Sequence, residues 1–344
     1  MKKTLLIGLV VAFATSAFAQ GLFKNVSKTG TAAAPFLEIS IGAPAVAMGG
    51  AFVSLANDAS ALYWNAAGIA SFPQSEIVAV HTNWIAETKF DFAGFVLPLG
   101  GFGTLGFSFT SLSMNDMMVR TVEKPEGTGE FFSAGDMAIG VSYSRMLNDR
   151  FSIGFTAKYI QETIWHEAAS AFAIDVGTIF RTDLLGGLTI GASLSNFGTS
   201  MQLSGRDTRQ FSRVDPTKLG SNDQIPSDVE MDSWDLPLLF QFGISTTPLK
   251  SDTYRWTVAV DALHPSDNYE SVNVGTEFAF QNYLFLRGGY QSLFLSGAEG
   301  GLSLGVGLAS TMFFTSNTLI KFDYAYRDMG RLEAVHVFSL AVRF

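Results

Sequence analysis

Two stretches of the sequence match motifs that carry chemistry in other proteins. Residues 301–305 read G-L-S-L-G and fit G-x-S-x-G, in which the serine nucleophile sits on a sharp turn from a strand into a helix. Residues 101–106 read G-F-G-T-L-G and fit the dinucleotide-binding pattern G-x-G-x-x-G, which must open a helix after a strand. In both places apolar residues alternate onward as in a strand. We therefore predict neither a catalytic serine nor a nucleotide site.

Residues that commonly bind metals or act as bases are few and scattered. The chain has no cysteine, so disulfides and thiolate metal sites are excluded. Its histidines lack the spacing of a metal site, and they are His81, His166, His264 and His336. A Ser-His-Asp site assembled from loops stays open as an alternative, but no segment indicates one. We predict that the protein is not an enzyme and has no cofactor and no metal.

Composition and patterning favour strands that cross a membrane. Hydrophobic residues make up 47% of the chain, which has 31 Phe, and charged residues make up only 15%, below the roughly 25% of soluble domains. After residue 20 no apolar run is long enough for a membrane-spanning helix. The net charge of −9 and the absence of a basic stripe argue against a nucleic-acid partner. Apolar residues spread in alternation are typical of an outer-membrane β-barrel surrounded by lipid.

The N-terminus has the pattern of a secretory signal peptide. Lys2 and Lys3 precede an apolar core at residues 5–13, and residues 17–19 read A-F-A, as a cleavage site requires. An N-terminal membrane anchor is the alternative, which the short apolar run disfavours. We predict removal of residues 1–19 and export to the bacterial outer membrane.

The sequence after residue 75 contains 14 alternating segments of about the length that a tilted membrane strand needs. They are Glu76–Ala86, Lys89–Leu97, Gly103–Met114, Ser133–Met146, Phe151–Ile164, Ser170–Thr182, Leu188–Phe197, Leu236–Thr247, Tyr254–Leu263, Ser271–Phe280, Tyr283–Ser292, Gly300–Ala309, Thr318–Arg327 and His336–Phe344. The longest connections, residues 115–132 and 198–235, both fall on one side, as in barrels with short periplasmic turns. The second of them is rich in charge and is either a recognition loop or a solvated cap.

Alternation within these segments assigns side chains to the two faces of the wall. The terminal Phe344 follows alternating apolar residues and resembles the signal by which the barrel assembly machinery recognises its substrates. The polar face carries charges of both signs, which either pair with each other and with a plug or line a transport path. These candidate luminal charges are Lys158, Asp175, Arg255, Asp261, Glu277, Lys321, Asp323 and Arg343.

Residues 42–68 do not alternate and read as a small helical plug that the barrel encloses. Pro44 suits the first turn of a helix that continues to about Leu55, and Asp58 suits the N-cap of a second turn over Ala59–Trp64. We predict an all-β, antiparallel transmembrane barrel of about 14 strands at residues 76–344. Residues 20–75 precede it as the N-terminal segment and plug.

The plug sequence resembles a known family signature. Residues 47–70 read A-M-G-G-A-F-V-S-L-A-N-D-A-S-A-L-Y-W-N-A-A-G-I-A, similar to A-M-G-G-A-F-V-A-x-A-D-D-x-S-A-x-Y-W-N-P-A-G of the PorV/PorQ group of outer-membrane proteins. That group is similar in turn to the FadL family of long-chain fatty-acid channels, which are 14-stranded barrels with an N-terminal hatch. Asn57 stands where the signature has Asp, and Ala66 replaces its Pro, which weakens any gating role carried over from that Pro.

Two functions follow from the resemblance. The first is a component of the type IX secretion system that binds secreted cargo or the translocon, and the motif favours it. The alternative is a FadL-like passive channel for hydrophobic molecules such as long-chain fatty acids. In either case we predict that a latch holds the plug, with Tyr63 and Trp64 against the wall and Asn65 bonded to backbone groups of the turn. The predicted latch residues are Asn57, Asp58, Tyr63, Trp64, Asn65 and Gly68.

Overall fold

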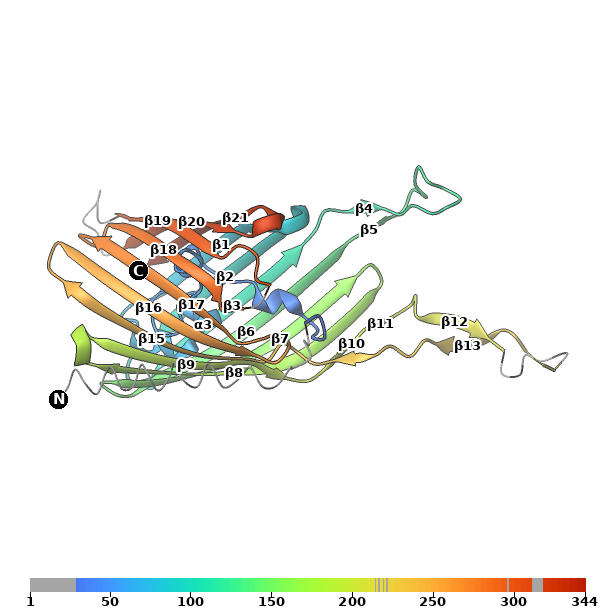
Figure 1. Ribbon diagram of the computed structural model, residues 1–344. Coiled ribbons are helices and arrows are strands. Elements are labelled where there is room, and N and C mark those ends of the chain that lie inside the picture. The colour runs from blue at the N-terminus through green and yellow to red at the C-terminus, as the bar shows by residue number, and fades with distance from the viewer. Residues whose placement is uncertain are drawn as a thin grey trace, which may run out of the picture.

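The fold was analysed in a computed structural model, which describes residues 29–344 apart from residues 214, 216, 219, 221, 296 and 311–317. The predicted signal peptide and its cleavage site lie outside the described residues. Within the described part of the chain, 14 antiparallel strands close into a barrel (Figure 1). The predicted fold class, a 14-stranded antiparallel barrel, is confirmed.

Each wall strand pairs with its neighbours in the order β8-β7-β6-β3-β2-β1-β21-β20-β19-β18-β17-β16-β15-β9, and β9 returns to β8. The strands are β1 (Glu76–Asn83), β2 (Lys89–Pro98), β3 (Thr104–Ser113), β6 (Ala134–Asn148), β7 (Phe151–Ile164), β8 (Glu167–Thr182), β9 (Leu188–Gly198), β15 (Leu239–Lys250), β16 (Tyr254–Pro265), β17 (Ser271–Phe280), β18 (Leu284–Leu293), β19 (Leu302–Ala309), β20 (Leu319–Asp328) and β21 (Ala334–Arg343). The first and last of them pair along the seam, from Glu76 opposite Arg343 to Asn83 opposite His336.

Short connections and the C-terminus share one end of the barrel, whereas the two longest connections extend from the other end (Figure 1). We call the end with the short connections and the C-terminus the inner end of the barrel, and the end with the longest connections the outer end. The outer connections contain short strand pairs that the sequence did not predict, because two to four residues are too few to establish alternation. They are β4 (Met117–Met118) with β5 (Phe131–Phe132), β10 (Met201–Gln202) with β14 (Ser233–Trp234), β12 (Arg209–Ser212) with β13 (Ile225–Asp228), and β11 (Ser204–Gly205) on the edge of β8.

Alternation gives the wall an outer face rich in apolar side chains. In β21, Val337 and Ser339 are buried toward the lumen, whereas Phe338 and Leu340 are 36% and 46% exposed on the outside. The terminal Phe344 is also exposed, and its N–H donates to the Ser75 carbonyl across the seam. No helix in the described residues is both long and apolar enough to cross a membrane.

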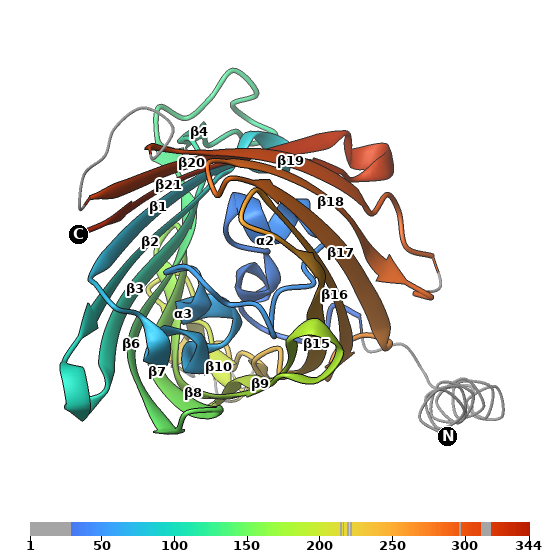
Figure 2. The same cartoon turned by 90° about the vertical axis from the view of Figure 1, so that its left-hand side faces the viewer.

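The described residues before β1 lie mostly inside the ring of strands (Figure 2). We call residues 29–72 the inner segment. It contains the 3-10 helix η2 (Pro35–Glu38), the helices α2 (Ala43–Ala47) and α3 (Ala61–Trp64), and the 3-10 helix η3 (Ala66–Ser71). Single 3-10 turns also occur between strands: η4 (Ile85–Glu87), η5 (Gly100–Phe102), η6 (Leu184–Gly186) and η8 (Gly330–Leu332).

Both helices of the inner segment are shorter than the sequence suggested. The helix that begins at Ala43 ends at Ala47 and does not continue to Leu55, because Gly49 and Gly50 adopt φ of 65° and 75°. The second helix begins at Ala61, so its N-cap position is Ser60 and not Asp58, and the Ser60 side chain makes no capping hydrogen bond. The Asp58 carboxylate instead accepts the Ser60 N–H at 2.9 Å and also the Ser60 hydroxyl, which forms a local turn before the helix.

Candidate functional site

Wall glycines allow the inner segment to lie directly against the barrel. A Cβ atom built on Gly154 would lie 2.4 Å from the Ala66 backbone, and one on Gly289 would lie 2.2 Å from the Met48 carbonyl carbon. Real Cβ atoms do not approach that closely, so these positions exclude every larger residue. The wall glycines with a comparable neighbour in the inner segment are Gly106, Gly154, Gly177, Gly191, Gly243, Gly275, Gly289 and Gly305. They surround most of the lumen.

Side chains of the wall also hold the backbone of the inner segment. Asp261 of β16 accepts the N–H groups of Phe52 and Val53 at 2.8 and 2.9 Å through one carboxylate oxygen. On the opposite wall the Ser339 hydroxyl accepts the Ala43 N–H at 2.7 Å. The Asp261 carboxyl was predicted as a luminal charge, and it bonds to backbone amides rather than to a basic side chain.

Asn65 joins the inner segment to two strands. Its side-chain oxygen accepts the Ala67 N–H at 3.1 Å and so caps the η3 turn. Its amide nitrogen lies 2.9 Å from the Val53 carbonyl, 3.1 Å from that of Thr178 in β8 and 3.4 Å from that of Ala192 in β9. Gly177 leaves the space for this side chain. One amide therefore bridges the turn and the wall.

We expect Asn65→Ala to lower the free energy of unfolding by about 1–3 kcal/mol, because buried carbonyls lose their donor. Asn57→Ala is the matched control, since Asn57 is exposed in the same segment, and it should stay within about 0.5 kcal/mol of wild type. Thermal unfolding of both purified variants in detergent measures this difference. Equal midpoints for the two variants would contradict the bridging role of Asn65.

The other proposed latch residues contact mainly the inner segment itself. The Trp64 indole N–H donates to the Ile41 carbonyl at 2.8 Å, and its ring lies edge-on to Tyr63 and Phe52. Gly68 lies against the Ala56 carbonyl, which leaves no room for a side chain. These contacts hold the segment in one compact shape.

Tyr63 also faces the lumen. Burial first, and then the nearby Glu38 and Asp175 carboxylates, raises the pKa of the Tyr63 phenol above its ordinary range. The hydroxyl therefore stays protonated at neutral pH. It donates a hydrogen bond to the Leu37 carbonyl at 3.1 Å.

Glu76, which the sequence analysis missed, connects the inner segment to the barrel seam. One of its carboxylate oxygens accepts the Ala59 N–H at 2.7 Å, and the other accepts the Arg343 Nε–H at 2.7 Å. Arg343 lies opposite Glu76 in the pairing of the first and last strands, and its guanidinium stacks over Phe72. The predicted luminal charge Arg343 therefore contacts both the seam and the segment.

The remaining predicted charges near the inner end form one network around a further missed residue. Arg287 of β18 bonds to Glu277 at 2.8 Å and to Asp323 at 2.6 Å, and Arg255 bonds to the second oxygen of Glu277 at 2.9 Å. Lys321 lies over the Phe285 ring. Arg287 was detectable, because its position in the alternation of β18 faces the lumen.

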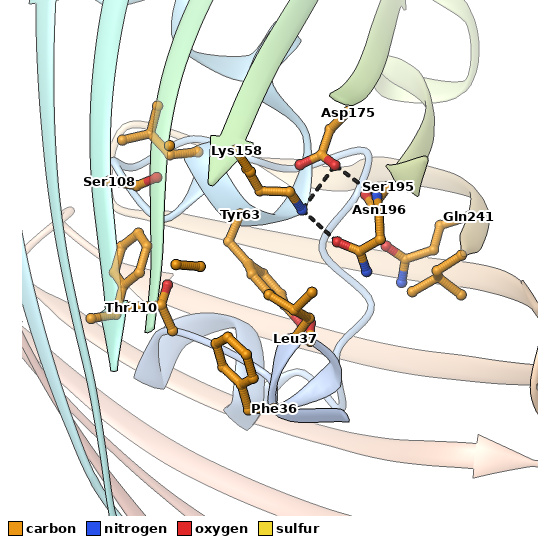
Figure 3. Close-up of a pocket in the computed structure, with 15 residues that line it drawn as sticks. Phe36, Leu37, Tyr63, Ser108, Thr110, Lys158, Asp175, Ser195, Asn196 and Gln241 are labelled. Carbon is orange, nitrogen blue, oxygen red and sulfur yellow. Dashed lines mark hydrogen bonds and ion pairs between the residues drawn. The ribbon is translucent and has the colours of Figure 1, made fainter. Parts of the chain in front are cut away.

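An enclosed cavity of about 40 Å³ lies between the inner segment and the wall (Figure 3). Its apolar side consists of Phe36, Leu37 and Leu62 with Phe92 of β2. In Figure 3 the side chains of Lys158, Asp175 and Asn196 gather on the other side of Tyr63. The cavity is therefore amphipathic, with one apolar and one polar side.

A bulge in β9 forms the polar side of this cavity. Asp175 of β8 stands opposite both Ser195 and Asn196, where the register of the two strands shifts. Asn196 adopts a φ of 65°, and its N–H donates to Asp175 at 2.8 Å. Lys158 pairs with the same carboxylate at 2.9 Å and also contacts the Asn196 amide oxygen. Side chains thus replace backbone pairing at this point of the wall.

The four histidines form no common site. Each has its own partner: Asp91 for His81, Asp207 for His166, Glu270 for His264 and the Tyr324 hydroxyl for His336. No group of three or more metal-binding side chains occurs among the described residues.

The closed 14-strand barrel is a fold that other solved proteins share. A Pseudomonas aeruginosa FadL homologue is 11% identical, covers 88% of this chain and 98% of its own, and superposes with a TM-score of 0.50. The Pseudomonas putida toluene transporter TodX is 12% identical over 88% and 96% of the two chains, with a TM-score of 0.52. The CymD monoaromatic hydrocarbon channel is 11% identical over 89% and 97%, with a TM-score of 0.51.

These superpositions establish a FadL-like fold, and at such low identity they establish the fold alone. The sequence itself matches the model of an uncharacterised protein family, UPF0164, over residues 9–151. No curated protein matches the chain. The PorV/PorQ resemblance receives no support from these comparisons.

Proposed function

We propose that this protein is an outer-membrane channel through which small hydrophobic molecules cross passively. Residues 20–75 act as its plug and residues 76–344 as its barrel. The observation that carries the proposal is the enclosed cavity between plug and wall, which Phe36, Leu37, Leu62 and Phe92 make apolar on one side. Apolar pockets with a few placed polar groups are typical small-molecule sites. This was the alternative hypothesis from the sequence, and the comparisons favour it.

The described conformation corresponds to a closed channel. Its cavity of about 40 Å³ has room for water only, since a cavity that binds benzene measures about 150 Å³. Passage therefore requires movement of η2, which carries Phe36 and Leu37 over the cavity. The bulge at Asn196 borders the same cavity. A substrate that leaves the cavity at this point would pass either into the lumen or out through the wall. The polar side of the cavity, with the Lys158–Asp175 ion pair and the Asn196 amide, would favour a substrate with a polar end.

We expect cells that lack their own hydrophobic channel to take up radiolabelled toluene or oleate faster when they express this protein. Ala138→Leu should reduce the uptake severalfold, because Ala138 lines the cavity and the larger side chain fills it. Ala157→Leu is the matched control, since Ala157 is exposed on the outer face of the neighbouring strand. Uptake equal to that of cells with empty vector would rule out the channel.

The secretion role remains a second candidate, because the motif resembles that group and the outer connections project beyond the barrel (Figure 1). Phe211 and Trp234 are 66% and 46% exposed there, as contact residues for a protein would be. A pull-down through a tag in residues 198–235 distinguishes the two candidates. Co-purification of a large translocon or of secreted proteins would favour secretion, and recovery of the barrel alone with a bound lipid or fatty acid would favour the channel.

A further inference from the structure

The outer face of the barrel has a groove across its seam. Ala79 of β1 and Ala93 of β2 lie opposite each other and form the floor. Phe109 of β3 borders one side, and Leu340 with Phe322 borders the other. The groove has a volume of about 370 Å³. Because Val78 and Val80 are buried toward the lumen, Ala79 faces away from it, and the groove opens where lipid surrounds the barrel.

Polar side chains begin directly above this groove. His81 and Asp91 stand opposite each other one step along the outer face, 2.7 Å apart and about half exposed. Asn83 and Lys89 form the next opposed pair toward the outer end. Below the groove the same face continues as Ile77. The change from apolar to polar side chains therefore places the headgroup level of the outer leaflet at His81 and Asp91.

We propose that this seam groove binds one phospholipid of the outer leaflet through an anionic headgroup. An acyl chain fills the slot over Ala79 and Ala93, between the rings of Phe109 and Phe322. The headgroup phosphate lies at Lys89 and the amide of Asn83, which offer one charged and one neutral donor. An open apolar groove with a polar cap and a cation at one end fits a membrane lipid. The site is separate from the cavity and does not depend on the proposed channel.

Native mass spectrometry tests the proposal on the full-length barrel. The protein is reconstituted in nanodiscs of phosphatidylethanolamine and phosphatidylglycerol and then released into detergent. The mass of the protein with any bound lipid is then measured. We expect one phosphatidylglycerol to stay bound to wild type. Ala79→Phe should reduce the retained fraction about tenfold, the effect of losing roughly 55 Å² of apolar contact at about 25 cal/mol per Å². Lys89→Gln should remove the preference for phosphatidylglycerol over phosphatidylethanolamine.

Ala157→Phe is the control, because it adds the same ring to the outer face of β7, and it should retain lipid like wild type. Ala93→Leu replaces Ala79→Phe if that variant does not fold, as judged by its mobility in unheated gels. The proposal is wrong if wild type retains no lipid, or if the groove variants retain as much as Ala157→Phe. A mass of two barrels in place of a lipid adduct would also overturn it, because a second copy would then cover the seam.

Discussion

Gly289→Ala is expected to displace the inner segment and make the barrel leaky. The new Cβ would lie 2.2 Å from the Met48 carbonyl carbon and 2.3 Å from the Gly49 nitrogen. Both are backbone atoms that cannot rotate away, so either the segment or the strand must move, at a cost of about 1–3 kcal/mol. Single-channel recording in planar bilayers should show open events that are rare or absent in wild type.

Gly288→Ala is a closely matched control. Gly288 is the preceding residue of the same strand but faces outward, and its Cβ would meet the Leu304 side chain at 3.6 Å and the Ser303 carbonyl oxygen at 4.0 Å, both ordinary contacts. Alanine also suits a strand interior better than glycine, by about 0.5–1 kcal/mol. Gly288→Ala should therefore conduct like wild type and unfold no earlier. If Gly289→Ala behaves like Gly288→Ala, the inner segment does not depend on close contact with the wall.

The barrel was predictable because each wall strand repeats one physical rule. Side chains alternate between the outer face and the lumen along β21, for example, and the period of two is visible in the sequence alone. Strand ends differ from the prediction by a few residues, since pairing continues beyond the alternating part. β8 begins at Glu167 rather than Ser170 because β7 still offers a pairing partner there. The short outer strands have no such signal.

The contacts inside the lumen were only partly predictable. The odd or even position of a residue in a strand identifies whether its charge faces inward, but it does not identify its partner. Asp261 bonds to backbone amides of the inner segment, and Arg287 links two carboxylates on different strands. The register of neighbouring strands decides such partners. The helix that starts near Pro44 was predicted, but its end at Ala47 was missed, since glycine is compatible with a weak helix as well as with its end. Only the positive φ at Gly49 and Gly50 distinguishes the two.

Arg287→Met is expected to destabilise the barrel more than any other single charge removal in the network. Arg287 and Asp323 side chains are each 6% exposed and that of Glu277 is 11% exposed, so neither carboxylate regains water when its partner disappears. Removing one member of a buried ion pair costs about 3–5 kcal/mol, because an uncompensated charge stays buried. Arg255 still pairs with Glu277, whereas Asp323 keeps no other ion pair among the described residues. Denaturant unfolding of the barrel in detergent or lipid vesicles measures the loss.

Two further variants separate burial from charge in this prediction. Arg150→Met removes an arginine from the exposed pair with Asp183, whose side chains are 58% and 93% exposed, and it should cost no more than about 1 kcal/mol. The double variant Arg287→Met, Asp323→Asn also removes the carboxylate that loses its partner, while Glu277 keeps its pair with Arg255, and it should recover most of the stability lost in Arg287→Met. Recovery would mean that the unpaired Asp323 carboxylate causes the loss. If the double variant is as unstable as Arg287→Met, the contact of the guanidinium with the Phe285 ring matters more than the unpaired carboxylate.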